Sequence, residues 1–94
     1  MRIEWSARAN QDVYTIQSYI ERQNISASYE AVDRITAAVK MLEEFPEIGR
    51  PGRIARTREL VVQKTPYIVV YNVRASAIGV VAVLHSAQRW PRSL

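Results

Sequence analysis

Residues 58–85 read RELVVQKTPYIVVYNVRASAIGVVAVLH, and this stretch decides the fold of the chain. It contains three apolar runs rich in β-branched residues, over 58–64, 67–73 and 78–85, and this composition is typical of β-strands. Turn residues separate the runs, so we expect an antiparallel meander. Because the runs are almost continuously apolar, the sheet should be covered on one face and partly covered on the other.

The residues before this stretch predict two helices. One apolar series at helical spacing runs through residues 9–20, with Ser6 as the expected N-cap. A second series runs through 29–45, with Ser26 or Ser28 as its cap. The connector is short, so the helices should pack as an antiparallel hairpin. The tyrosines of these helices are expected at the hairpin seam: Tyr14, Tyr19 and Tyr29.

Two further segments complete the predicted order. Residues 2–5 are a short strand candidate, and residues 45–57 form a loop because their prolines and glycines cannot continue a helix. The predicted fold is therefore α+β, a single domain over residues 1–94 in the order β-α-α-β-β-β. An antiparallel helical hairpin should pack on an antiparallel sheet.

The composition limits the possible functions. There is no cysteine and only one histidine, so we expect no disulfide, no metal site and no bound cofactor. No apolar run approaches the length of a membrane span, and we expect a cytoplasmic protein with no membrane contact.

The charge of the chain is divided between its two halves. Residues 1–49 carry five basic and eight acidic side chains, a net of −3. Residues 50–94 carry eight basic side chains against Glu59 alone, a net of +7. Seven of those eight cations are arginines, which make bidentate contacts with phosphate and carboxylate. The C-terminal half should therefore bind something anionic.

The sequence pattern of residues 45–91 resembles that of a known family. FPEIGRPGR leads to TRELVV, then to TPYIVVYNV and finally to VLHSAQRWP. Together with the predicted order of elements, this pattern resembles the RelE/ParE superfamily of type II toxin–antitoxin toxins, also called plasmid stabilization proteins. The resemblance covers essentially the whole chain.

The resemblance implies a growth-arresting toxin that a cognate antitoxin, encoded beside it, holds inactive. The ParE-like members of the superfamily poison DNA gyrase, and the RelE-like members cleave mRNA in the ribosome. For this chain we expect a ParE-like toxin; the alternatives are a RelE-like mRNA interferase and a binding module that has lost toxicity. Whether the chain is an enzyme stays open at this point. The antitoxin should contribute an acidic and apolar segment.

Cleavage of RNA needs a proton acceptor, a proton donor and cations near the phosphate. The candidates are His85 and Glu59 for proton transfer and Arg58, Arg74 and Arg89 for charge. Ribosome-dependent nucleases of the superfamily often have an arginine in the central strand, in a pattern like Arg-Leu-Val-Tyr. Ile68 stands at that place here, which weakens the nuclease interpretation. A structural role for His85, at the edge of the core, is the stronger reading.

The candidate target-binding residues lie on the Gly/Pro-bounded loop, the strand after it and the tail: Arg50, Arg53, Arg56, Arg58, Arg89 and Trp90. Loop arginines are as often solvated as they are bound to a partner. Trp90 either anchors the tail on the sheet or presents a stacking face, and we favour the anchor.

Overall fold

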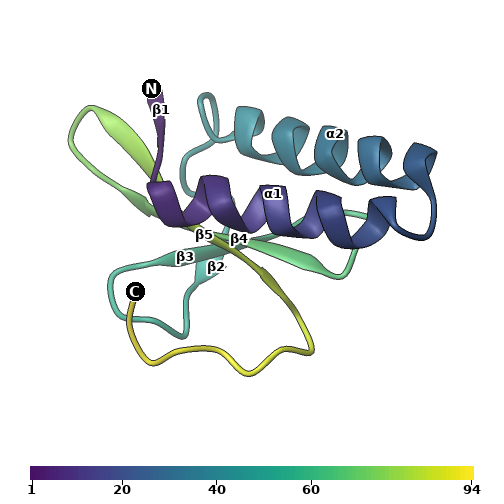
Figure 1. The fold of residues 1–94 in the computed structure, drawn as a ribbon. Helices are drawn as coiled ribbons and strands as arrows, with labels where there is room; N and C mark the ends of the chain where they lie inside the picture. Colours follow the sequence, from purple (N-terminus) through teal and green to yellow (C-terminus); the bar gives the residue numbers. More distant parts are fainter.

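The computed structural model describes residues 1–94, and two helices lie together on one face of a five-stranded sheet (Figure 1). No helix is both long and apolar enough to cross a membrane. The elements, in chain order, are β1 (Arg2–Trp5), α1 (Ala7–Glu21), α2 (Ile25–Met41), β2 (Arg50–Pro51), β3 (Arg58–Val61), β4 (Tyr67–Val73) and β5 (Ala77–His85).

The sheet has the strand order β1-β5-β4-β3-β2. Strands β3, β4 and β5 form the antiparallel meander that the sequence predicts. Strand β1 pairs in parallel with β5, so the sheet is mixed rather than purely antiparallel. No hairpin turn fixes the direction of β1, because the chain passes through both helices before it returns to the sheet. Strand β2 adds a two-residue edge strand within the segment predicted as a loop.

The two helices begin at different kinds of cap. Ser6 caps α1 as predicted, and its hydroxyl accepts a hydrogen bond of 2.9 Å from a backbone N–H three residues on. The cap of α2 is Asn24, whose side-chain oxygen accepts a bond of 3.0 Å in the same way. The prediction of Ser26 or Ser28 is wrong because α2 begins earlier. Ser28 is buried inside the helix, where its hydroxyl donates a hydrogen bond of 2.6 Å to a backbone carbonyl.

Contacts between α1 and β5 fix the hairpin on the sheet. The hydroxyl of Ser6 donates to the carbonyl of Val81 at 2.9 Å. The N–H of Val83 donates to a carboxylate oxygen of Asp12 at the same distance. The β4–β5 register shifts between Val70 and Tyr71, and Val81 is the extra residue of β5. The extra residue, Val81, is therefore the one whose carbonyl accepts the hydrogen bond from Ser6.

The core has a large and a small part, one on each face of the sheet. The large part lies beneath the helices and includes Ile35, Leu42, Val69 and Tyr71. The small part lies on the other face and consists of Val70, Ala82 and Leu84, with Val81 and Trp90 packed against it. The predicted partial cover of the second face is therefore supplied by the C-terminal tail.

The prediction for the helix tyrosines is wrong. Tyr14, Tyr19 and Tyr29 are 65%, 60% and 58% exposed. Small and branched side chains, among them Ala31 and Ile35, occupy the buried positions of the helices instead.

Tyr71 holds the loop after α2 against the sheet. It is completely buried, and its hydroxyl donates to the carbonyl of Pro46 and accepts from the N–H of Gly49, both at 2.9 Å. A Cβ atom on Gly49 would lie 2.6 Å from that hydroxyl oxygen, so only glycine fits there. Burial raises the pKa of Tyr71, which keeps the hydroxyl proton available for the bond to Pro46.

We predict that Tyr71→Phe lowers the free energy of unfolding by about 1–3 kcal/mol, because it leaves a buried N–H and a carbonyl without partners. Urea denaturation measures the loss. Tyr14→Phe is the matched control, since Tyr14 is exposed and should change stability by less than about 0.5 kcal/mol. Equal denaturation midpoints for the two variants would contradict the assigned role of the hydroxyl.

Candidate functional site: a basic face organised by Glu59

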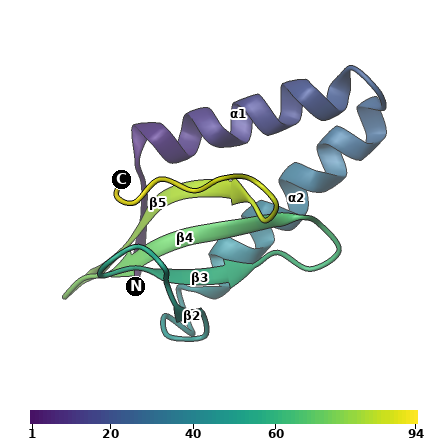
Figure 2. The ribbon, with the colours of Figure 1, turned by 90° about the horizontal axis from the view of Figure 1, so that it is seen from below.

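The face of the sheet opposite the helices carries two irregular segments. The loop between β2 and β3 crosses one part of it, and the tail after β5, drawn in yellow, runs over the other (Figure 2). Both segments line a hollow of about 270 Å³, with Arg56 on the loop side and Arg92 on the tail side. We call this surface the basic face and define it by the cations of β2, the loop and the tail: Arg50, Arg53, Arg56, Arg89 and Arg92.

Glu59 is the centre of the basic face. It is only 3% exposed, although it is the one carboxylate in this half of the chain. One carboxylate oxygen accepts from Arg50 at 2.9 Å. The other accepts from the backbone N–H of Arg53 at 2.8 Å and from its guanidinium at 3.3 Å. Glu59 therefore fixes both the backbone and two side chains of the loop.

These contacts keep Glu59 ionised. Burial by itself would raise the pKa of the carboxyl group. The hydrogen bonds from the N–H of Arg53 and from the side chains of Arg50 and Arg53 outweigh burial, so the pKa of Glu59 lies below its ordinary value. A carboxylate in this state is a poor proton donor or acceptor near neutral pH.

Arg53 connects Glu59 to the tail. Its guanidinium carbon lies 3.6 Å from the centre of the Trp90 ring, in a cation–π contact. The indole N–H of Trp90 donates to the carbonyl of His85 at 3.0 Å, and the ring packs on the small core of this face. Trp90 is thus an anchor of the tail. We call Glu59, Arg53 and Trp90 the clamp.

Three cations of the basic face have no anionic partner. Arg56, Arg89 and Arg92 are exposed, and none of them takes part in an ion pair within the chain. Arg56 has a φ of 65°, the left-handed conformation that a non-glycine residue adopts mainly in turns. These three guanidinium groups are available to an external anion.

Arg58 and Arg74 lie apart from this set. Arg58 points to the helix side of the sheet. There its guanidinium donates a hydrogen bond of 2.6 Å to the carbonyl of Gly49 and lies 3.6 Å from the carboxylate of Glu47. Arg74 follows β4 and pairs with Glu4 at 2.6 Å. Each has its own local partners, so the two cations do not converge on one point with Arg89.

The two candidates for proton transfer lie on opposite faces of the sheet. Glu59 pairs with Val70, which belongs to the small core. His85 pairs with Tyr67, which belongs to the large core beneath the helices, and the two rings meet edge to face at 5.6 Å. The His85 ring nitrogen Nδ1 accepts from the N–H of Ala87 at 3.0 Å, as expected of a residue that ends a strand. The structure therefore does not assemble the nuclease candidates into one site, nor does it gather three or more His, Asp or Glu side chains that could hold a metal ion.

Glu59, a candidate for proton transfer from the sequence, lies instead in a network of ion pairs. Its neighbour Arg58 is not one of the partners, because adjacent residues of a strand point to opposite faces. The partners are Arg50 and Arg53, which the loop returns to the same face. The sequence does contain one indication of this network. Glu59 is the only acidic side chain among eight basic ones, so several cations can share it as a partner.

Known proteins resemble this chain along nearly its whole length. The family model described as the ParE toxin of the type II toxin–antitoxin system parDE matches residues 3–90. This chain belongs to the ParE toxin family. It is therefore the toxin of a type II toxin–antitoxin pair, and its partner is an antitoxin.

Two curated relatives and one solved structure agree with the family. The chain is 42% identical over 93 residues to Y4kP of Sinorhizobium fredii, a candidate toxin, with 99% of this chain and 96% of that protein covered. It is 33% identical over 87 residues to the toxin RelE2 of Caulobacter vibrioides, with coverage of 93% and 97%. A chain of the chromosomal ParDE system from P. aeruginosa shares the fold, with a TM-score of 0.83, 22% identity and coverage of 90% of this chain and 95% of that one.

The state of Glu59 makes the stability of this toxin depend on pH. Since its folded pKa lies below the ordinary value of 4.5, ionised Glu59 stabilises the fold above that pH. The stabilisation is lost as the pH falls from about 4.5 through the lower, folded pKa. We predict that Glu59→Gln lowers the free energy of unfolding by about 1–3 kcal/mol at pH 7. The difference from the unsubstituted protein should shrink as the pH falls through this window.

Thermal unfolding at a series of pH values measures this effect. Glu44→Gln is the control because Glu44 is exposed, and its substitution should leave the pH profile nearly unchanged. A constant difference between Glu59→Gln and the unsubstituted toxin from pH 7 down to strongly acidic pH would show that ionised Glu59 does not stabilise the loop.

Proposed function

We propose that this toxin arrests growth by binding DNA gyrase through its basic face and trapping the enzyme on broken DNA, and that its antitoxin prevents this. Membership of the ParE family supports the proposal. So does the supply of three unpaired arginines on one face, since such groups bind phosphate or carboxylate on a partner.

One observation favours gyrase binding over RNA cleavage: Glu59, the only carboxylate side chain of the basic face, makes structural contacts. Glu59 is buried, ionised and bonded to two arginines, and His85 lies on the other face of the sheet. A toxin that acts by binding needs no proton-transfer group. Glu59 holds the backbone of the loop that carries Arg56 through the N–H of Arg53, so this loop loses little freedom when a partner binds to it.

The first test is a DNA cleavage assay with purified gyrase and folded toxin released from its antitoxin. We expect broken DNA to accumulate in proportion to the toxin. Cleavage of ribosome-bound mRNA by the same preparation, with gyrase unaffected, would instead assign the RelE-like activity. Growth unaffected by the toxin without its antitoxin would identify a binding module.

The free arginines provide the second test. We predict that Arg56→Ala with Arg92→Ala raises the toxin concentration needed for half-maximal DNA breakage at least about tenfold, equivalent to roughly 1.4 kcal/mol of lost binding. Arg22→Ala with Lys40→Ala is the matched control, because it removes the same charge from exposed, unpaired positions at the C-cap of α1 and in α2. Equal potency of both double variants would exclude the basic face as the gyrase-binding surface.

A further inference from the structure

Two hollows on the second face of the sheet meet at one side chain. The hollow of about 270 Å³ between the loop and the tail is lined by Arg56 and Arg92. A second hollow, of about 330 Å³, lies toward β1 and includes Arg74. Asn72 and Val81 line both hollows, so the two lie side by side across β4 and β5. We call them together the Asn72 channel.

The side-chain amide of Asn72 makes no hydrogen bond within the chain. Asn72 follows Tyr71, which belongs to the large core, so its side chain lies on the second face. Its oxygen is the one buried side-chain polar atom of the protein without a hydrogen-bond partner. Gly79 of β5 leaves room for it, since a Cβ atom there would overlap this oxygen and lie 2.9 Å from the guanidinium of Arg74. Because an unpartnered buried acceptor costs about 1–3 kcal/mol, a ligand that donates to Asn72 removes a cost that the free toxin bears.

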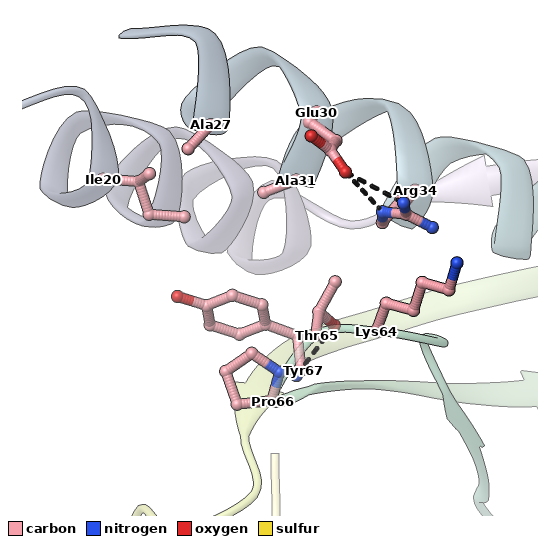
Figure 3. A pocket seen from close by; sticks show the side chains of 9 residues that line it. All are labelled: Ile20, Ala27, Glu30, Ala31, Arg34, Lys64, Thr65, Pro66 and Tyr67. Atoms are coloured by element: carbon pink, nitrogen blue, oxygen red, sulfur yellow. Dashed lines mark hydrogen bonds and ion pairs between the residues drawn. The ribbon is translucent and has the colours of Figure 1, made fainter. Parts of the chain in front are cut away.

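The cavity beside α2 differs from the Asn72 channel in this respect (Figure 3). There Glu30 accepts a hydrogen bond of 2.9 Å from Arg34, and the hydroxyl of Thr65 accepts one of 3.1 Å from the N–H of Tyr67. The Asn72 channel instead combines an amide without partners with guanidinium groups of the basic face that have no anion within the chain.

The groups that line the channel match the parts of a nucleotide. Arginine side chains bind phosphate, and those of the channel lie at its loop and tail end. The amide of Asn72 offers an acceptor beside a donor, and asparagine binds the edge of a base with this pair of groups. The buried Ile54 and the half-buried Val81 give the channel apolar surface for the base. A phosphate or carboxylate alone would occupy the arginines and leave the amide without a partner.

We propose that the Asn72 channel binds an unpaired nucleotide of a DNA strand, with phosphates at Arg56 and Arg92 and the pairing edge of the base at Asn72. On this edge each base carries a hydrogen-bond donor beside an acceptor, and both are free only when the base is unpaired. The source of the nucleotide rests on the proposed function, because broken DNA on gyrase supplies strand ends.

The experiment measures the Kd of the full-length toxin, released from its antitoxin, for two fluorescent thymidine oligomers of about eight nucleotides. Both carry the same phosphates, but the bases of the second are methylated at N3, which removes the donor of the pairing edge. The variants are Asn72→Ala for the amide and Arg56→Ala with Arg92→Ala for the cations. Asn10→Ala, at an exposed position of α1, is the control for the amide, and the control for the cations is that of the gyrase assay.

We expect the methylated oligomer to bind the unsubstituted toxin at least about fivefold more weakly than the unmodified one. Asn72→Ala should bind both oligomers equally, at the weaker Kd. The arginine double variant should raise both Kd values by the same factor, at least about tenfold, and should make them less dependent on salt. The controls should keep the preference and both Kd values within about twofold.

Equal Kd values of the two oligomers for the unsubstituted toxin, or a preference that survives Asn72→Ala, would overturn the proposal. Both oligomers meet the same protein, so partial unfolding of a variant cannot imitate a lost preference. A uridine oligomer and free thymidine monophosphate offer the same edge, and tighter binding of either would overturn the assignment to a DNA strand.

The gyrase assay is independent of this measurement. A toxin without effect on gyrase that still discriminates the two oligomers through Asn72 would refute the proposed target and leave the nucleotide site standing. A toxin that poisons gyrase and binds both oligomers equally would refute the nucleotide site alone.

Discussion

The arrangement of the second sheet face depends on one buried carboxylate. Eight cations in the C-terminal half repel one another, and Glu59 is the only acid in that half. By accepting hydrogen bonds from Arg50 and Arg53, it draws the loop after β2 onto the sheet. Through the contact of Arg53 with Trp90, the same charge also holds the tail. The clamp thus orders the loop and the tail on the sheet. The arginines that it does not contact, Arg56, Arg89 and Arg92, are exposed.

The sequence predicted those parts of the structure that follow from local pattern. Helical spacing, turn residues and apolar runs determined the hairpin, the meander and the cap at Ser6. It did not predict what depends on contacts between distant residues. The parallel pairing of β1, the partners of Glu59 and the bond between Tyr71 and the loop each join residues that only the complete fold brings together. The three helix tyrosines were misplaced because an aromatic residue in a helix need not lie on its buried face.

The parallel pairing of β1 with β5 has a consequence for synthesis. The first strand, residues 2–5, bonds to residues 77–80, and β5 is the strand that α1 contacts most. Strand β1 and helix α1 cannot pack on the sheet until β5 has left the ribosome. The core of the nascent chain therefore cannot form before β5 is available. The sheet of this toxin therefore cannot close until residues 77–80 have been translated. The interval before closure is a time in which an antitoxin already present can meet the chain.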